Sequence, residues 1–208
     1  YAEFDLRIKD LRTGEDLPLQ LSRVSSIAWA GDNKTLYYGL LDDTLRSSKI
    51  YRRGINDPAS ELIYEELDAR YSCSISETKT REYLFISTSS STTSEEYYLE
   101  ATGEDRTPKL FIPREQDVRY SILTHRDRFY IYYKDKTHLN GMLYSADKDQ
   151  VAQREQWQLI VPHRPEVRLD TLGIYHEHIV LEERREGLSR IRILSAIGEE
   201  LTTLSFPE

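Results

Sequence analysis

Short runs of alternating apolar and polar residues follow one another along almost the entire chain. The most apolar of these runs are centred at Tyr37, Leu84, Ile131 and Val180, which lie 47, 47 and 49 residues apart. Alternation with a period of two is typical of β-strands that bury one face. Self-similarity at about 40–50 residues is the signature of a β-propeller blade. The pattern therefore predicts an all-β chain built from blade-sized repeats.

Each repeat predicts four short strands with turn residues between them. The expected strands are 27–29, 36–41, 49–52 and 62–64, then 73–75, 83–86, 97–99 and 110–112, then 120–123, 129–133, 142–144 and 157–161, and finally 169–172, 179–181, 191–194 and 201–206. Ahead of them, 4–8 and 17–21 are expected to be the last two strands of an earlier unit. The predicted blade units are 1–24 as a half blade, 25–66, 67–114, 115–163 and 164–208.

Residues that favour tight turns separate the expected strands. Thr13-Gly14-Glu15-Asp16 recurs letter for letter as Thr102-Gly103-Glu104-Asp105, and Gly198-Glu199 holds the corresponding place in the last unit. Glycine suits such hairpins because it adopts positive φ at little steric cost. The stretch 88–94, which is made almost entirely of Ser and Thr, is expected to be a surface loop.

Four complete units and one half unit do not close a ring. Propellers usually complete one blade with strands from both ends of the chain, because an unclosed ring leaves sheet edges exposed. Here the last unit is already complete, so the opening half blade has no partner. We therefore expect a partial β-propeller of about four and a half four-stranded blades. The chain also starts without Met and directly in an alternating strand, which indicates a segment of a longer protein.

Composition narrows the class of protein further. Apolar residues make up 38% of the 208 positions and charged residues 31%, and no apolar run approaches the length of about 20 residues that a membrane-spanning helix needs. The net charge of −8 argues against nucleic-acid partners and favours cationic ligands, if charge steers any. Cys73 is the single cysteine, and we expect it to be a buried thiol on a strand. A soluble, cytoplasmic protein fits these features.

A series of short segments distributed over nearly the whole chain resembles one known family. These segments are Trp29 with Asp32, Tyr37-Tyr38, 45–53, 61–66, 74–76, 83–87, 94–99, and Glu183-Arg184 with Gly187-Leu188. Together they are similar to the N-terminal propeller of the prolyl oligopeptidase family, and within it to the oligopeptidase B, or protease II, group. The chain departs from that group at one place, where it has Arg46-Ser47 and then Arg53 instead of Arg-Pro followed shortly by His.

The resemblance implies a seven-bladed propeller joined to an α/β-hydrolase domain, which supplies the Ser, Asp and His of a catalytic triad. In such enzymes the propeller covers the active site and admits only short, unstructured peptides, and the oligopeptidase B group cleaves after Arg or Lys. The resemblance thus implies that this chain is a regulatory propeller fragment of a serine peptidase. Its partners would be short peptide substrates and the hydrolase domain that this chain lacks.

Residues suited to catalysis or metal binding are not grouped in the sequence. No Gly-x-Ser-x-Gly elbow is present. The nearest approach, 187–191, lacks the second Gly, and we expect Ser189 to be a surface turn residue. The five histidines are scattered: His125, His138, His163, His176 and His178. His176 and His178 could share one face of a strand, but no third ligand accompanies them. We therefore expect no catalytic, cofactor or metal-binding residue, and a chain that is inert alone.

Acidic pairs are plentiful but do not predict a site. In Glu95-Glu96, Glu182-Glu183 and Glu199-Glu200, adjacent strand residues point to opposite faces, which favours solvated faces or cross-strand ion pairs over paired catalytic carboxylates. The run 146–150 lacks the central Gly and terminal Glu of an EF-hand loop and is expected to be a polar hairpin turn.

Two other interpretations stay open. The first is a self-contained propeller module that binds a protein or glycan partner, which the unmatched strands at the start disfavour. The second is an unrelated β-sandwich from outside the cytoplasm, which the regular blade-length period disfavours.

Overall fold

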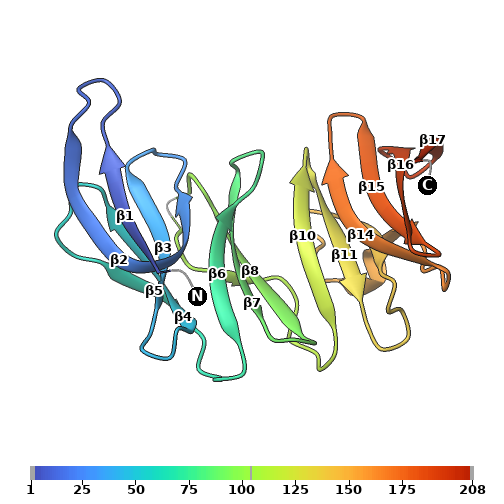
Figure 1. The fold of residues 1–208 in the computed structure, drawn as a ribbon, viewed down its shortest axis with the longest axis horizontal. Helices are drawn as coiled ribbons and strands as arrows, with labels where there is room; N and C mark the ends of the chain where they lie inside the picture. The colour runs from blue at the N-terminus through green and yellow to red at the C-terminus, as the bar shows by residue number, and fades with distance from the viewer. Residues whose placement is uncertain (1–2, 104, 207–208) are drawn as a thin grey trace. The chain divides into compact units, whose positions relative to one another are not determined.

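The computed structural model describes residues 3–103 and 105–206, which form an all-β structure with one short 3₁₀ helix, η1, in the described part (Figure 1). The strands group into four antiparallel sheets, one of five strands and three of four. The elements are β1 Phe4–Lys9, β2 Asp16–Trp29, β3 Thr35–Leu41, β4 Ser47–Gly54, β5 Glu61–Glu65, β6 Ser72–Glu77, β7 Tyr83–Ser89, β8 Ser94–Glu100, β9 Lys109–Leu110, β10 Arg119–His125, β11 Arg128–Lys134, β12 Met142–Asp147, η1 Arg154–Gln156, β13 Gln158–Val161, β14 Val167–Ile174, β15 His178–Arg185, β16 Leu188–Ser195 and β17 Glu200–Ser205.

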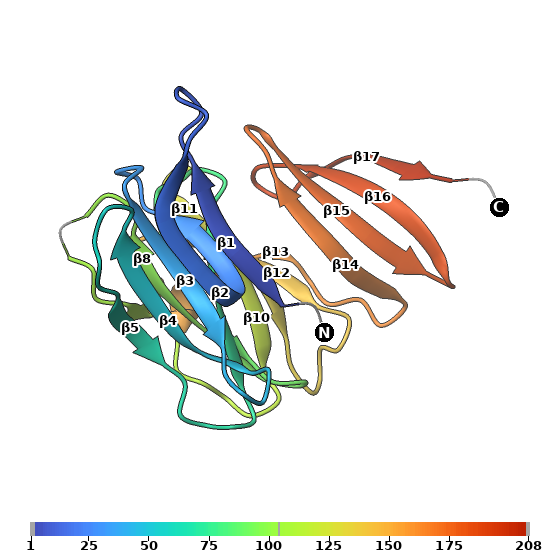
Figure 2. The same ribbon diagram turned by 60° about the vertical axis from the view of Figure 1, so that its left-hand side comes forward.

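The chain divides into two compact units. The first comprises Tyr1–Ser91 with Glu95–Pro113 and holds sheets β1–β5 and β6–β9, whereas the second comprises Thr92–Ser94 with Arg114–Glu208 and holds sheets β10–β13 and β14–β17. Within each sheet the strands follow one another in sequence order, as Figure 2 shows for β14 to β17. The expected all-β architecture of four-stranded repeats is confirmed. No helix among the described residues has the length and apolar character that crossing a bilayer requires.

The start of the chain differs from the sequence prediction. The expected strands 17–21 and 27–29 are one continuous strand, β2, whose first part pairs with β1 and whose last part pairs with β3 (Figure 1). The side chain of Val24, which pairs with both β1 and β3, is buried. The pairing with β1 is irregular beside it, where Arg23 has a φ of 62°. The segment therefore continues as a strand, and β1 and β2 enlarge the first sheet instead of forming a sheet of their own.

The four most apolar runs of the sequence become the second strand of the blade-length repeat in each sheet. These strands, β3, β7, β11 and β15, lie between two neighbours. Their most buried side chains include Leu36, Leu84, Ile131 and Ile179, each with no exposed surface. A strand that is covered on both faces needs apolar residues at successive positions, so the strongest apolar runs mark the sheet interiors.

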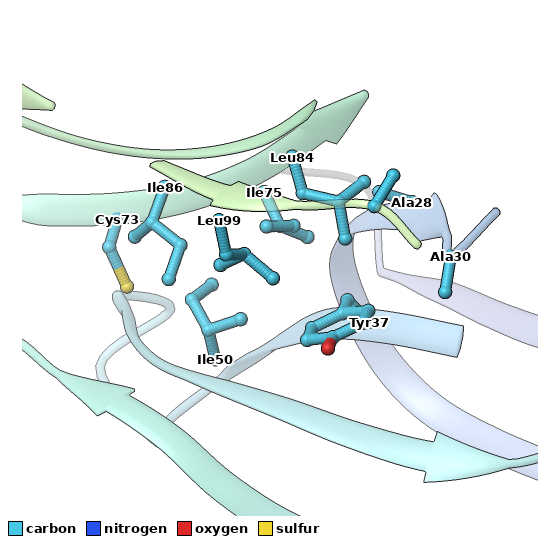
Figure 3. Close-up of a cluster of buried hydrophobic side chains, with 10 residues drawn as sticks. Ala28, Ala30, Tyr37, Ile50, Cys73, Ile75, Leu84, Ile86 and Leu99 are labelled. Atoms are coloured by element: carbon cyan, nitrogen blue, oxygen red, sulfur yellow. The ribbon is translucent and has the colours of Figure 1, made fainter. Parts of the chain in front are cut away.

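The core of the first unit lies between its two sheets. Tyr37 and Ile50 from the first sheet meet Ile75, Leu84 and other apolar residues of the second (Figure 3). Cys73 lies at the same interface and is 3% exposed, which confirms the expected buried thiol. Burial also raises the pKa of Cys73 to about 11. Full burial of each such large apolar side chain contributes about 1.5–3 kcal/mol.

Arg46 fixes the connection between the same two sheets. Its Nε donates to the carbonyl of Tyr71 at 2.6 Å, and its Nη2 donates to the carbonyls of Glu66 and Asp68 at 2.8 Å each. These three carbonyls belong to the segment between β5 and β6. One guanidinium thus satisfies several backbone acceptors that no strand pairs.

The second unit has its own core between its two sheets. Leu143 and Val161 of β12 and β13 belong to one cluster with Leu169, Ile179 and Leu194 of the last sheet. The hydroxyl of Tyr132 on β11 donates to the carbonyl of Leu169 on β14 at 2.7 Å. Apolar packing is therefore supplemented by a directional contact between the sheets.

The turns only partly follow the sequence prediction. Gly14 and Gly198 adopt positive φ values of 75° and 93°, as hairpin glycines were expected to do. Gly103, within the repeated tetrapeptide, has no φ in the left-handed region, and Glu104 lies outside the described residues. Identical letters therefore adopt different backbone conformations in different surroundings.

Only the middle of the Ser- and Thr-rich stretch 88–94 is the expected surface loop: residues 90–93 connect β7 to β8, and Ser91 and Thr92 are exposed. Thr88 lies within β7, Ser94 begins β8, and both side chains are buried. The Ser94 hydroxyl donates to the carbonyl of Tyr120 at 2.8 Å. Hydroxyl groups can be buried when they have such partners, so a polar composition did not indicate exposure here.

Candidate functional site

Ser189 lies in a strand and not in a turn as predicted. It is the second residue of β16 and is paired with Arg184 of β15. The turn itself is Glu186-Gly187, whose φ values of 53° and 85° match a two-residue hairpin of type I′. A hairpin between antiparallel strands does not present a serine as the strand-to-helix elbow of a hydrolase does. Ser189 therefore has no nucleophilic setting.

The structure brings the histidines together in pairs. The ring centroids of His125 and His176 are 6.4 Å apart, and His125 Nε2 lies 3.1 Å from the carbonyl oxygen of His176. The rings of His138 and His163 are 5.2 Å apart. His176 lies in the bend before β15, so the expectation that it shares a strand face with His178 is wrong. Within residues 3–103 and 105–206, no group of three or more His, Cys, Asp or Glu could hold a metal ion.

Glu183 forms the cross-strand ion pair that the sequence favours for the acidic pairs. Glu183 is 4% exposed, and its carboxylate lies 2.6 Å from Arg192 Nη2 on β16. Arg164 forms a second ion pair with the same oxygen. Glu199 and Glu200 are exposed, in agreement with a solvated face. One buried carboxylate held by two guanidinium groups is typical of a structural ion-pair network.

Glu95 and Glu96 are both buried on β8, which contradicts a solvated face. Ser87 donates its hydroxyl proton to Glu96 at 2.5 Å, but burial dominates and raises the pKa of Glu96 to about 8. The Tyr97 hydroxyl donates to Glu95 at 3.2 Å. Their environment arises from the packing of the β5, β7 and β8 side chains, which the alternation pattern alone does not reveal.

A buried polar cluster continues from these residues. The rings of Tyr64 and Tyr97 pack with centroids 4.9 Å apart, and the Tyr64 hydroxyl lies 3.4 Å from Glu66. Burial raises the pKa of Tyr64 above its usual range, with Tyr97 and Glu66 adding to the effect. Such a network fixes the packing of the strands, and its two half-buried tyrosines lie at the border of the core.

A more accessible candidate site lies in the second unit, at the first strands of its two sheets. β10 and β14 are edge strands in their sheets, and exposed edges offer free backbone groups. A pocket of about 260 Å³ is formed by residues of β10, β11 and β14. Its lining residues are Ser121, Leu123, Tyr132, Leu169, Asp170, Thr171 and Leu172.

Asp170 is the charged residue of this pocket, and a β-bulge places it there. Leu169 pairs with Glu183 and Thr171 pairs with Glu182, so Asp170 is an extra residue without a partner across the ladder. Bulges of this kind redirect a side chain and are common beside functional sites. The sequence does not reveal the bulge. Its one signal for this site is a charged residue, Asp170, inside the expected strand 169–172.

Two arginines keep the Asp170 carboxylate ionised. Arg168 forms a close ion pair with one oxygen, and Arg184 Nε lies 3.1 Å from the other. The hydrogen bond from Arg168 is the main reason that the pKa of Asp170 lies below its usual value, and burial opposes it. The carboxylate therefore carries its charge throughout the neutral pH range.

Tyr132 and Lys134 complete the surroundings of Asp170. Burial, with a contribution from Asp170, raises the pKa of Tyr132 to about 12. The Lys134 ammonium lies 5.2 Å from the Tyr132 ring centroid, and burial lowers its pKa. The pocket thus combines apolar walls with one carboxylate, and the cationic groups of Arg168, Arg184 and Lys134 lie near it.

Comparison with known proteins agrees with the fold described above. The family model for the prolyl oligopeptidase N-terminal β-propeller domain matches residues 3–207. The chain belongs to the prolyl oligopeptidase family. The propeller fold that its repeats predicted is thereby confirmed, and the matched part is the N-terminal propeller domain of the peptidases in this family.

Solved structures and curated relatives of the prolyl oligopeptidase family cover most of this chain. Oligopeptidase B from Leishmania major is 23% identical, with a TM-score of 0.91 over 99% of this chain and 30% of its own. Oligopeptidase B from Trypanosoma brucei is 23% identical, with a TM-score of 0.81. That match covers 91% of this chain and 28% of the Trypanosoma brucei chain. At these identities the structures show the fold alone.

Dipeptidyl aminopeptidase BI from Pseudoxanthomonas mexicana is 29% identical over 203 residues. Those residues cover 94% of this chain but only 27% of the aminopeptidase. The chain thus spans about a quarter of the length of this curated relative.

Proposed function

We propose that this chain is the regulatory propeller part of an oligopeptidase B-like serine peptidase and limits access to the active site to short peptides. The observation that carries the proposal is the family match over residues 3–207, supported by the TM-score of 0.91 to an oligopeptidase B. The hydrolase domain, with the triad, is the partner that this role requires. The chain alone is then catalytically inert.

In this proposal the four sheets are successive blades of a seven-bladed propeller: units 67–114, 115–163 and 164–208 each hold one sheet, and units 1–24 and 25–66 share the first sheet through β2. Blades of a propeller are arranged around a central channel. In the second unit the first strands of the blades, β10 and β14, would line that channel, and the Asp170 pocket would face peptides that pass through it.

The parent enzyme in this proposal cleaves after Arg or Lys. The resemblance to oligopeptidase B supports this preference, and the net charge of −8 favours cationic peptides. Removal of dipeptides is a second candidate activity, supported by the 29% identity to a dipeptidyl aminopeptidase. A blocked peptide with one internal Arg distinguishes the two, because a dipeptidyl aminopeptidase needs a free amino terminus whereas an endopeptidase does not.

Two experiments test the proposal. The chain by itself should not hydrolyse a short Arg-containing chromogenic peptide, and turnover that is abolished by changing one of its own residues would contradict it. The longer protein that contains this propeller should cleave a short peptide and, more slowly, the same cleavage sequence inserted in a folded domain. The kcat/KM for the short peptide should be at least about tenfold higher than the kcat/KM for the folded substrate. Equal cleavage of both substrates would overturn the role in limiting access.

The alternative of a self-contained module that binds a protein or glycan predicts a different shape in solution. X-ray scattering from a closed ring, with the N-terminal strands paired to the last sheet, would favour that module over the proposal. We place the parent enzyme in the cytoplasm, a location that the free, buried thiol of Cys73 supports. Cell fractionation that recovers it only outside the cytoplasm would contradict this placement.

A further inference from the structure

A second pocket, of about 390 Å³, lies in the first unit beside the connection between β4 and β5. Five charged residues line it: Arg52, Arg53, Asp57, Glu61 and Arg106. The arginines come from β4 and from the loop that follows β8, so segments distant in sequence place positive charge around one cavity. This pocket is far along the chain from Asp170 and has no role in the proposed control of peptide access.

Arg52 is only partly satisfied by the residues around it. Its Nε and Nη2 lie 2.6 Å and 2.5 Å from one oxygen of Glu61, so this pair is neutral overall. The remaining nitrogen, Nη1, is buried and forms no hydrogen bond of good geometry among the described residues, although the Tyr37 hydroxyl lies near enough to help raise the pKa of Arg52. Arg52 therefore contributes to the pocket mainly by neutralising Glu61.

Arg53 and Arg106 supply the free positive charge. Arg53 Nε donates to the backbone carbonyl of Asp57 at 2.5 Å. Neither Arg53 nor Arg106 has an ion-pair partner within 4.0 Å in the described part of the chain, although both are half-buried. Asp57 adds one negative charge to the lining. Because Arg52 neutralises Glu61 and Asp57 offsets one of the other two arginines, the lining keeps one positive charge in excess. Outside the lining, Asp32 lies near enough to Arg106 for that arginine to help lower the pKa of Asp32.

We propose that this pocket binds a small oxyanion with two negative charges, such as a phosphate group or a dicarboxylate. Guanidinium groups bind such oxygens through paired, charge-assisted hydrogen bonds. In the bound state the anion accepts from the free nitrogens of Arg53 and Arg106. The partial enclosure of the pocket strengthens these interactions relative to those at an open surface.

Calorimetric titration of the 208-residue chain with inorganic phosphate, at constant ionic strength, tests the proposal. Saturable binding is expected, and the double substitution R53Q/R106Q should weaken it by at least about tenfold, the effect of losing charge-assisted hydrogen bonds. Arg190→Gln is the matched control, because Arg190 is a half-buried arginine on β16 of the other unit. The control should bind phosphate as the unsubstituted chain does.

A second substitution keeps the test decisive if R53Q/R106Q does not fold. Asp57→Asn removes a negative charge from the pocket with little change in shape, and it should tighten phosphate binding several-fold. Titration with methyl phosphate and with succinate then distinguishes a phosphate site from a carboxylate site. Absence of saturable binding of all three anions, or affinities that respond equally to R53Q/R106Q and to Arg190→Gln, would overturn the proposal.

Discussion

The hydroxyl of Thr88 donates a hydrogen bond of 2.7 Å to the carboxylate of Glu66. Both residues are buried, with exposures of 0% and 6%. Glu66 follows β5 and Thr88 lies in β7, so the bond links the two sheets of the first unit. The same carboxylate also accepts the backbone N–H of Asp68 at 2.9 Å. One buried side chain thereby orders the segment that connects the sheets.

Thr88→Val should destabilise the fold because it removes the 2.7 Å hydrogen bond to the buried Glu66 carboxylate and keeps only longer contacts such as the 3.4 Å one with the Tyr64 hydroxyl. We expect a loss of about 1–3 kcal/mol in the free energy of unfolding. Thr88→Ser keeps the hydroxyl and loses one methyl group, which should cost about 1 kcal/mol. Urea denaturation measures both. If the valine variant is as stable as the serine variant, the hydrogen bond contributes nothing.

Arg46→Lys tests the guanidinium that holds the segment between β5 and β6. A lysine cannot reproduce the fork that donates to Tyr71, Glu66 and Asp68 together, so we expect a loss of about 2 kcal/mol in the free energy of unfolding. Arg70→Lys is the control, because the Arg70 side chain is 73% exposed. Comparable losses in the two variants would show that the three carbonyl contacts are not responsible.

Glu96 should make stability depend on pH. Burial raises its pKa to about 8 in the folded state, from its ordinary value of 4.5. Between these values the folded chain binds more protons at this site than the unfolded chain, so its contribution to stability is present below about 4.5 and is lost as the pH rises through about 8. Glu96→Gln removes this dependence.

Urea midpoints measured from pH 5 to pH 9 check the Glu96 prediction. The unsubstituted chain should lose on the order of 4 kcal/mol more than Glu96→Gln over this range. Glu155→Gln, at an exposed position in η1, is the control and should leave the pH profile unchanged. Parallel profiles for the Glu96 variant and the unsubstituted chain would contradict a raised pKa at this site.

Glu183→Ala should strongly destabilise the last sheet. It leaves Arg192, whose side chain is 14% exposed, with only the more distant carboxylate of Glu200, 3.7 Å from Nη1. Removal of one partner from a buried ion pair costs about 3–5 kcal/mol, and the partial exposure of Arg164 favours the lower end. Denaturation of Glu182→Ala provides the comparison, since Glu182 is the adjacent, half-buried residue on the opposite face. An equal cost for both would argue against the ion pairs.

Side-chain partners decided the features that the sequence did not predict. Thr88 and Ser94 belong to a polar stretch, yet both are buried because they donate to Glu66 and to the carbonyl of Tyr120. Glu95 and Glu96 form an acidic pair, yet both lie inside. A polar composition predicts that a segment is exposed, because burying polar groups costs free energy. Hydrogen-bond partners offset that cost, and composition does not show which partners the fold supplies.

The sequence by itself determined the family, the strand content and the sheet interiors around Tyr37, Leu84, Ile131 and Val180. Period-two alternation and apolar runs record burial directly, so this information is local. Only the tertiary structure decided that 16–29 is one strand, that Asp170 occupies a bulge, and that Arg52, Arg53 and Arg106 surround one pocket. These features depend on ladder register and on contacts between segments distant in sequence, which no local pattern encodes.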